Sequence, residues 1–206
     1  MTKISKADQI YNYTAHKLYY LHSLTETGFW KGKLANLRHG VGKKPGELPE
    51  LWGFIFDGMP EELFGHKSNG ASYNGASYAE WAVYTALTLY ALHQQGNTVY
   101  VNEKGVSLGK AAANLVKNEE GSEERIAKRL HLVATSTSQN DLAYYLRGVV
   151  QLLKAEPVPL DYARLAKEIY SMNFEESSKN IVLSWGREFY GALYERKGKE
   201  GETNGQ

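Results

Sequence analysis

Residues 78–95, YAEWAVYTALTLYALHQQ, contain the longest apolar run of the 206-residue sequence. Large apolar side chains such as Trp81, Val83, Leu87 and Leu89 point to every side of a helix drawn through this segment. A helix that is apolar all round has no face to present to water, so it belongs in the middle of a bundle. This segment therefore predicts a central helix, which Gly96 ends.

Helical periodicity also dominates the rest of the sequence, whereas the alternation typical of strands is nearly absent. We predict further helices at residues 5–24, 29–38, 48–57, 107–117, 122–134, 139–155, 160–172 and 177–196. The prediction is an all-α fold with two small helical-bundle domains, residues 1–100 and 101–197, joined by a short linker near residues 98–105. Residues 198–206 are polar and are predicted to form a disordered tail.

The composition excludes several classes of protein. The content of 42% hydrophobic and 23% charged residues is typical of a globular protein. The sequence has no cysteine, which excludes disulfides, thiol catalysis and cysteine zinc sites. It also contains no apolar run of about 18 residues, and its start lacks the apolar core of a signal peptide. We therefore expect a cytoplasmic protein that has no contact with a membrane, no metal ion and no cofactor.

Residues 28–52, GFWKGKLANLRHGVGKKPGELPELW, concentrate positive charge in a chain whose net charge is only +1. No acidic residue occurs in this segment before Glu47, although it contains five basic residues: Lys31, Lys33, Arg38, Lys43 and Lys44. An acid-free cluster of cations favours a polyanionic partner. The hypothesis is that this segment forms one wall of a nucleic-acid groove.

Two later helices carry basic stripes that could form the opposite wall. Arg125, Lys128 and Arg129 fall at i, i+3 and i+4, and Arg147 and Lys154 lie seven residues apart on the next helix. Such stripes are more often solvated helix faces than binding sites. Together with residues 31–44, however, they favour contacts with phosphates, whose binding would be sensitive to salt.

Catalytic motifs are weak in this sequence. Ser107-Leu-Gly-Lys110 matches the S-x-x-K pattern of some serine hydrolases, but the companion S-D-N and K-T-G motifs are missing. A serine that caps a helix explains the pattern better. The histidines lack metal-ligand spacing, and the tryptophans, which could stack on bases, occur at helical spacing typical of a core. The sequence predicts no enzyme.

Several segments together resemble the CasB family, the small subunit of the type I-E CRISPR surveillance complex, Cascade. The matching segments follow the family's order and cover most of the chain: LRHGVGKKPGELPELW at 37–52, AEWAVYTALTLYALHQQG at 79–96, GVSLGKAAA at 105–113, ERIAKRLHLVATS at 124–136, LAYYLRGVVQLLKAEPVPLDYARLAKEIY at 142–170, and WGREFYGAL at 185–193.

This resemblance implies a non-enzymatic helical subunit that assembles with other Cascade subunits and with a second copy of itself. Its basic surfaces would stabilise the crRNA–target DNA heteroduplex and the displaced DNA strand. The family's basic sites fall by position on Arg38, Lys110, Arg125, Arg129 and Arg147. Two departures are His39, where the family often has a second arginine, and lysine in place of arginine at 110, which loses the bidentate guanidinium.

Other interpretations stay open at this point. The chain could be a structural helical adaptor that binds acidic partner proteins, or, less favoured, an S-x-x-K serine hydrolase or a helix-turn-helix regulator. The segment Gly65–Ser77 contains the repeat Asn-Gly-Ala-Ser-Tyr at 69–73 and 74–78, which is typical of a flexible connection. It resembles an insertion of unknown purpose.

Overall fold

The computed structural model describes residues 4–65 and 75–203. Over these ranges it has nine α-helices and no β-strand, which confirms the predicted all-α fold. In chain order the helices are α1 Lys6–Ser23, α2 Phe29–His39, α3 Trp52–Ile55, α4 Tyr78–Gln94, α5 Leu108–Asn114, α6 Ser122–Ala134, α7 Gln139–Ala155, α8 Tyr162–Ser171 and α9 Glu175–Thr203, with 3-10 turns at Pro49–Leu51 and Glu61–Leu63.

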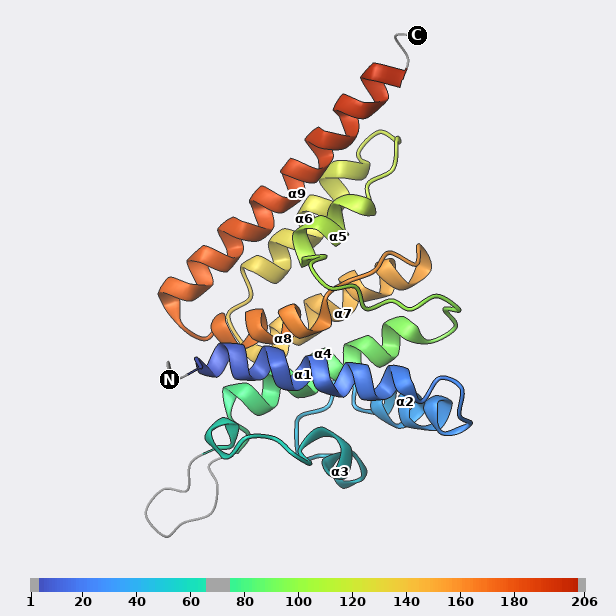
Figure 1. Cartoon of the computed structure of the whole chain (residues 1–206). Coiled ribbons are helices and arrows are strands. Elements are labelled where there is room, and N and C mark those ends of the chain that lie inside the picture. The colour runs from blue at the N-terminus through green and yellow to red at the C-terminus, as the bar shows by residue number, and fades with distance from the viewer. Residues whose placement is uncertain (1–3, 66–74, 204–206) are drawn as a thin grey trace.

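Helix α4 lies at the centre of the fold, as its all-round apolar sequence predicted. It packs against α1, α2, α7 and α8, and Leu87 and Tyr90 within it are fully buried. In Figure 1, α1 and α8 lie side by side in front of α4. Each of these helices therefore buries part of its surface against α4, and α4 fixes their relative positions.

The helices after residue 100 do not separate cleanly from those before it. Helix α8 packs on α1, and α7 packs on α4, while α5 packs along α9 and against α6. The division at residue 100 stays a prediction. Helix α9 projects beyond the other helices at its C-terminal end (Figure 1) and extends past the predicted end at Arg196 to Thr203. Residues 204–206 of the predicted disordered tail lie outside the described part.

Side-chain caps explain where several helices begin. The hydroxyls of Ser5, Ser107 and Ser138 each accept a hydrogen bond from the backbone N–H three residues later. Ser77 caps α4 in the same way, and the Glu80 carboxylate bonds back to the Ser77 N–H, which completes a capping box. These short-range signals are present in the sequence, so the starts of the helices were predictable.

The predicted helix at residues 48–57 is wrong in part. The structure has a 3-10 turn at Pro49–Leu51 followed by the single turn of α3. Gly53 within this segment and Gly58 after it lower the helix propensity, and Gly58 takes a positive φ of 72° that a helix cannot contain.

The connection near residue 100 is bonded to the body of the protein. The Leu160 N–H donates to the Val101 carbonyl at 3.0 Å, and a single parallel bridge joins Asn102 to Leu160. The Asn102 side chain also accepts from the Tyr162 N–H at 2.9 Å. This segment therefore holds the start of α8. No helix in the described ranges combines the length and the apolar composition needed to cross a membrane.

Candidate nucleic-acid interface

The loop after α2 is held firmly against the central helix. The Tyr84 hydroxyl on α4 donates to the Gly40 carbonyl at 3.0 Å, and Gly40 itself is buried. Gly42 then takes a φ of 81°, a left-handed conformation that favours glycine. The turn directs the chain so that Lys43 and Lys44 remain exposed beside α4 and α7.

A hollow of about 510 Å³ lies where this loop, α4 and α7 meet. Lys43, Lys44 and Arg147 line it, so cations far apart in the sequence share one cavity. The loop and α7 are in near contact here, because a Cβ atom on Gly42 would lie 3.7 Å from Arg147 Nη1. Two acidic residues, Glu47 and Asp141, line the same hollow.

A second hollow of about 520 Å³ adjoins the first along α7. Its lining includes Arg129 from α6 and Arg147, Tyr144 and Gly148 from α7. Gly148 leaves the α7 surface open beside Arg129, whose Nη1 would lie 3.8 Å from a Cβ at position 148. Tyr144 and Arg147 line both hollows, so the two hollows meet at these side chains and together make up one basic surface. We call this surface the basic groove and define it by Lys43, Lys44, Arg129, Tyr144 and Arg147.

Positive charge dominates the basic groove. Its four cations face two carboxylates, and Asp141 already accepts a hydrogen bond from the Ser138 hydroxyl at 2.7 Å near the start of α7. All four basic side chains belong to residues that are exposed to solvent. Exposed cations in a concave surface attract phosphates without a large desolvation cost, and salt should weaken that attraction.

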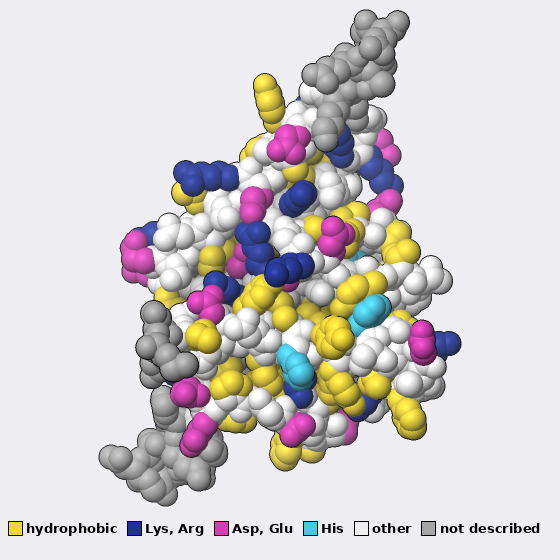
Figure 2. All heavy atoms as spheres, viewed as in Figure 1, with side chains coloured by type: hydrophobic (Ala, Val, Ile, Leu, Met, Phe, Trp, Pro, Cys, Tyr) yellow, Lys and Arg dark blue, Asp and Glu magenta, His cyan; other side chains and the backbone are white. Residues whose placement is uncertain are grey.

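On another face of the molecule, basic residues are balanced by nearby carboxylates. On the face where α1, α8 and α9 lie in front, Figure 2 shows basic and acidic side chains interspersed. Arg164 pairs there with Glu168 at 2.7 Å and with Glu188 at 2.9 Å, and Lys167 pairs with Asp8 at 2.6 Å. Such pairing leaves little net field for an anionic ligand, in contrast to the basic groove.

Three of the predicted site residues lie outside the basic groove and contact other side chains. The Lys33 ammonium lies over the Phe54 ring, with 5.5 Å from Nζ to the ring centroid. Arg125 pairs with Glu119 at 3.4 Å, and Lys154 donates to the Gln95 side chain at 2.9 Å. Four more predicted residues line neither hollow, although all are at least partly exposed: Lys31, Arg38, Lys110 and Lys128. Their role in binding stays a prediction.

Ser107 acts as a helix cap, as predicted. Its side chain accepts from the Lys110 N–H at 3.1 Å, and Ser107 is only 1% exposed. The Lys110 side chain is exposed, so the two residues of the S-x-x-K pattern occupy different environments. A buried capping hydroxyl cannot reach a substrate, and this geometry removes the support for the serine hydrolase interpretation.

Tyr144 is the groove residue that the sequence analysis missed. The tryptophans were considered as possible stacking groups, yet Trp185 is buried in the core and Trp52, which is 48% exposed, lies outside the groove. Trp81 lines the first hollow but is only partly exposed. The sequence spacing could have identified Tyr144, because it lies three residues before Arg147 and therefore on the same helix face.

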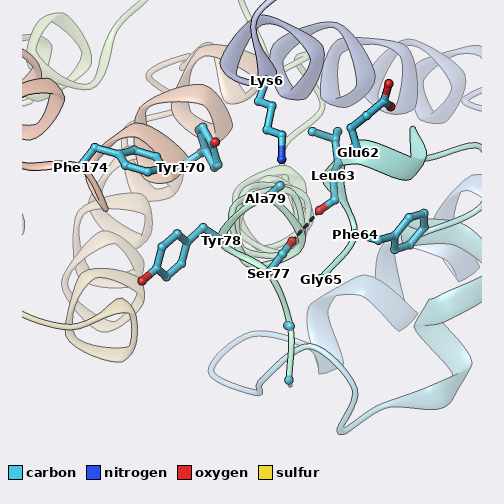
Figure 3. Close-up of a pocket in the computed structure, with 12 residues that line it drawn as sticks. Lys6, Glu62, Leu63, Phe64, Gly65, Ser77, Tyr78, Ala79, Tyr170 and Phe174 are labelled. Carbon is cyan, nitrogen blue, oxygen red and sulfur yellow. Dashed lines mark hydrogen bonds between the residues drawn. The ribbon is translucent and has the colours of Figure 1, made fainter. Parts of the chain in front are cut away.

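A third hollow, of about 470 Å³, lies at the start of α4 (Figure 3). Here the Ser77 hydroxyl donates to the Leu63 carbonyl at 2.6 Å, and the Glu80 carboxylate accepts from the Gly65 N–H at 3.1 Å. The α4 capping box thus joins the two ends of the predicted Gly65–Ser77 loop. Residues 66–74, which the prediction of a flexible connection concerns, lie outside the described residues. Within the described ranges no three His, Asp or Glu side chains are placed to hold a metal ion.

Comparisons with solved structures show which proteins share this fold. It is similar to CasB from Thermobifida fusca, with a TM-score of 0.70 and 26% identity over 88% of this chain and 97% of that chain. For CasB from Thermus thermophilus the TM-score is 0.64 and the sequence identity is 20%, over 92% of this chain and 100% of that chain. For a chain of a CRISPR RNA-guided surveillance complex the TM-score is 0.66 and the sequence identity is 16%, over 93% of this chain and 99% of that chain.

Among curated proteins none matches the sequence. The family model of the CRISPR-associated protein Cse2, however, matches residues 33–190, which include every residue of the basic groove. Because that match covers most of the sequence, and because the CasB structures share the fold, the predicted resemblance is confirmed: the chain belongs to the CRISPR-associated Cse2 (CasB) family.

Proposed function

We propose that this chain is a nucleic-acid-binding subunit of a type I-E CRISPR Cascade complex in the cytoplasm. It would hold the crRNA–target DNA heteroduplex and the displaced DNA strand by their phosphates, while guide–target pairing supplies sequence specificity. Cse2 proteins are structural subunits and not known enzymes. Membership of this family, and the likeness to a chain of an RNA-guided surveillance complex, support the assembly part of the proposal.

The observation that carries the binding part is the meeting of Lys43 and Lys44 with Arg147 and Arg129 in one groove. Residues about 100 positions apart in the sequence contribute cations to a single concave surface. A phosphate backbone that follows the groove would contact the loop, α7 and α6 in turn. Each neutralised phosphate releases counterions, so binding should weaken as salt rises.

The test is charge reversal in the assembled complex. We expect R129E combined with R147E to weaken capture of target DNA by at least about 10-fold, since each reversal replaces an attraction to phosphate by a repulsion. The matched control is R187E on α9, an exposed arginine outside the groove that undergoes the same chemical change. DNA capture should be measured by filter binding at two salt concentrations. Equal capture by wild type and the double variant would refute the proposed groove.

A structural adaptor remains the alternative, because α9 exposes an apolar stripe. Leu183, Tyr190 and Tyr194 are 50%, 57% and 81% exposed and fall at i, i+7 and i+11, on one side of the helix. Exposed apolar stripes of this kind suit protein partners, which here would be other Cascade subunits or a second copy of this chain. Crosslinking within the assembly separates the alternatives: groove residues should crosslink to nucleic acid, and an adaptor would give crosslinks to protein only.

A further inference from the structure

Tyr144 presents an aromatic ring to solvent at the centre of the basic groove. Its relative exposure is 71%, and it lines both hollows. Tyr145 meets it in a T-shaped contact with 5.5 Å between ring centroids. This contact restrains the Tyr144 ring without covering it. A restrained but uncovered ring loses little conformational freedom when a flat ligand packs on it.

The surroundings of Tyr144 specify the chemistry of that ligand. Arg147 lies one helical turn further along α7, and Arg129 lines the same hollow from α6. A ligand that fits must therefore combine a flat apolar group with anionic groups at its sides. An unpaired nucleotide has this combination, and each hollow exceeds the roughly 300 Å³ at which small-molecule sites begin.

We infer that Tyr144 is a stacking platform for an unpaired base of single-stranded nucleic acid, whose flanking phosphates lie against Arg147 and Arg129. This inference rests on the proposed function and deepens it, because it assigns the basic groove to single-stranded nucleic acid. In a duplex both faces of each base are already stacked on neighbouring bases. An unpaired base of a single strand offers its face to a protein ring, and such stacking tolerates any sequence.

The test separates base stacking from phosphate contacts. The full chain, as wild type, Y144A or Y144F, is titrated at low salt against a fluorescein-labelled dT20 strand and against a 20-mer made of abasic sites. Both strands have the same phosphates, but only the first has bases. We expect Y144A to bind dT20 at least about 5-fold more weakly than wild type and to bind the abasic strand equally well. Y144F keeps the ring and should match wild type on both strands.

Several outcomes would overturn the inference. If Y144A weakened both strands equally, the ring would act only by supporting the groove. If it weakened neither, its exposure would serve some other contact, such as a protein partner. A second readout is photo-crosslinking of a 5-iodouracil strand, in which mass spectrometry should find residue 144 as the attachment point.

R147E distinguishes failure of this inference from failure of the proposed function. If R147E weakens binding of both strands while Y144A weakens neither, the phosphate groove stands and the stacking role falls. If R147E changes neither strand, the groove and the stacking role fall together. Because Tyr144 and Arg147 are both exposed, these variants should fold, and circular dichroism checks that they do.

Discussion

The hydroxyl of Tyr84 donates a 3.0 Å hydrogen bond to the carbonyl of Gly40, and this bond joins the basic loop to the centre of the protein. Burial raises the pKa of Tyr84 to about 12, so the hydroxyl keeps its proton and can donate throughout the neutral range. Gly40 permits this approach because it has no side chain. The position of Lys43 and Lys44 opposite Arg147 thus depends on a contact in the core.

Substitution of Gly40 should therefore destabilise the protein. A Cβ there would lie 2.7 Å from the Tyr84 hydroxyl and 2.8 Å from both Leu51 Cδ1 and Thr88 Cγ2. We expect G40A to lower the free energy of unfolding by about 1–3 kcal/mol, measured by urea denaturation. The matched control is G32A within α2, the helix that Gly40 follows, where no atom lies within 4 Å of the new Cβ. G32A should leave the free energy of unfolding unchanged or raise it by up to about 1 kcal/mol. Equal effects of G40A and G32A would contradict the packing argument.

Close packing of α5 on α9 makes a similar prediction for Gly109. A Cβ at this position would collide with the backbone carbonyl of Trp185, which cannot swing away as a side-chain tip could. G109A should lower the unfolding free energy by at least about 1–3 kcal/mol. The control is G186A, next to Trp185 on α9, where the added methyl meets no atom within 4 Å. A G109A variant as stable as wild type, with unchanged near-ultraviolet circular dichroism, would contradict the close packing of α5 on α9 at this position.

His93 should make stability depend on pH. It is fully buried at the end of α4 with its Nδ1 3.0 Å from the Tyr162 hydroxyl, and burial lowers its pKa from 6.5 to about 4. Below pH 6.5 the unfolded chain binds a proton at this residue and the folded chain does not, so stability falls as pH drops toward 4. Once the pH has fallen to the folded-state pKa, the total loss in the free energy of unfolding is roughly 3 kcal/mol.

The measurement for His93 is urea denaturation of wild type and H93Q at pH 7, 6 and 5. Glutamine cannot titrate, so H93Q should lose less stability than wild type across this range, whatever its stability at pH 7. Parallel decreases in the two proteins would mean that His93 does not contribute to the pH dependence.

Short-range features of the sequence were enough to predict the helices and the central place of one of them. Periodicity, the serine caps at positions 5, 107 and 138, and the apolar composition of residues 78–95 are all short-range features, so they could be recognised without knowledge of the fold. The segment at 48–57 was the exception, because Pro49 and Gly53 within it, and Gly58 directly after it, compete with its apolar spacing. The resemblance to the CasB family likewise depended on the sequence alone, and the family match confirms it.

Which cations share a surface depends on how the helices pack, so spacing along the sequence could not predict it. The charge pattern and the family resemblance together nominated eleven basic residues, yet four of them line the basic groove, while Arg125 lies against Glu119 and Lys33 over Phe54. The tertiary structure also leaves Tyr144 exposed in a hollow that Arg129 and Arg147 line as well. The physical reason is that helix periodicity specifies which residues share a face, but the packing of α2 and α7 on α4, and of α6 on α7, determines which faces meet. A central helix could be recognised from its own residues, and a groove between helices could not.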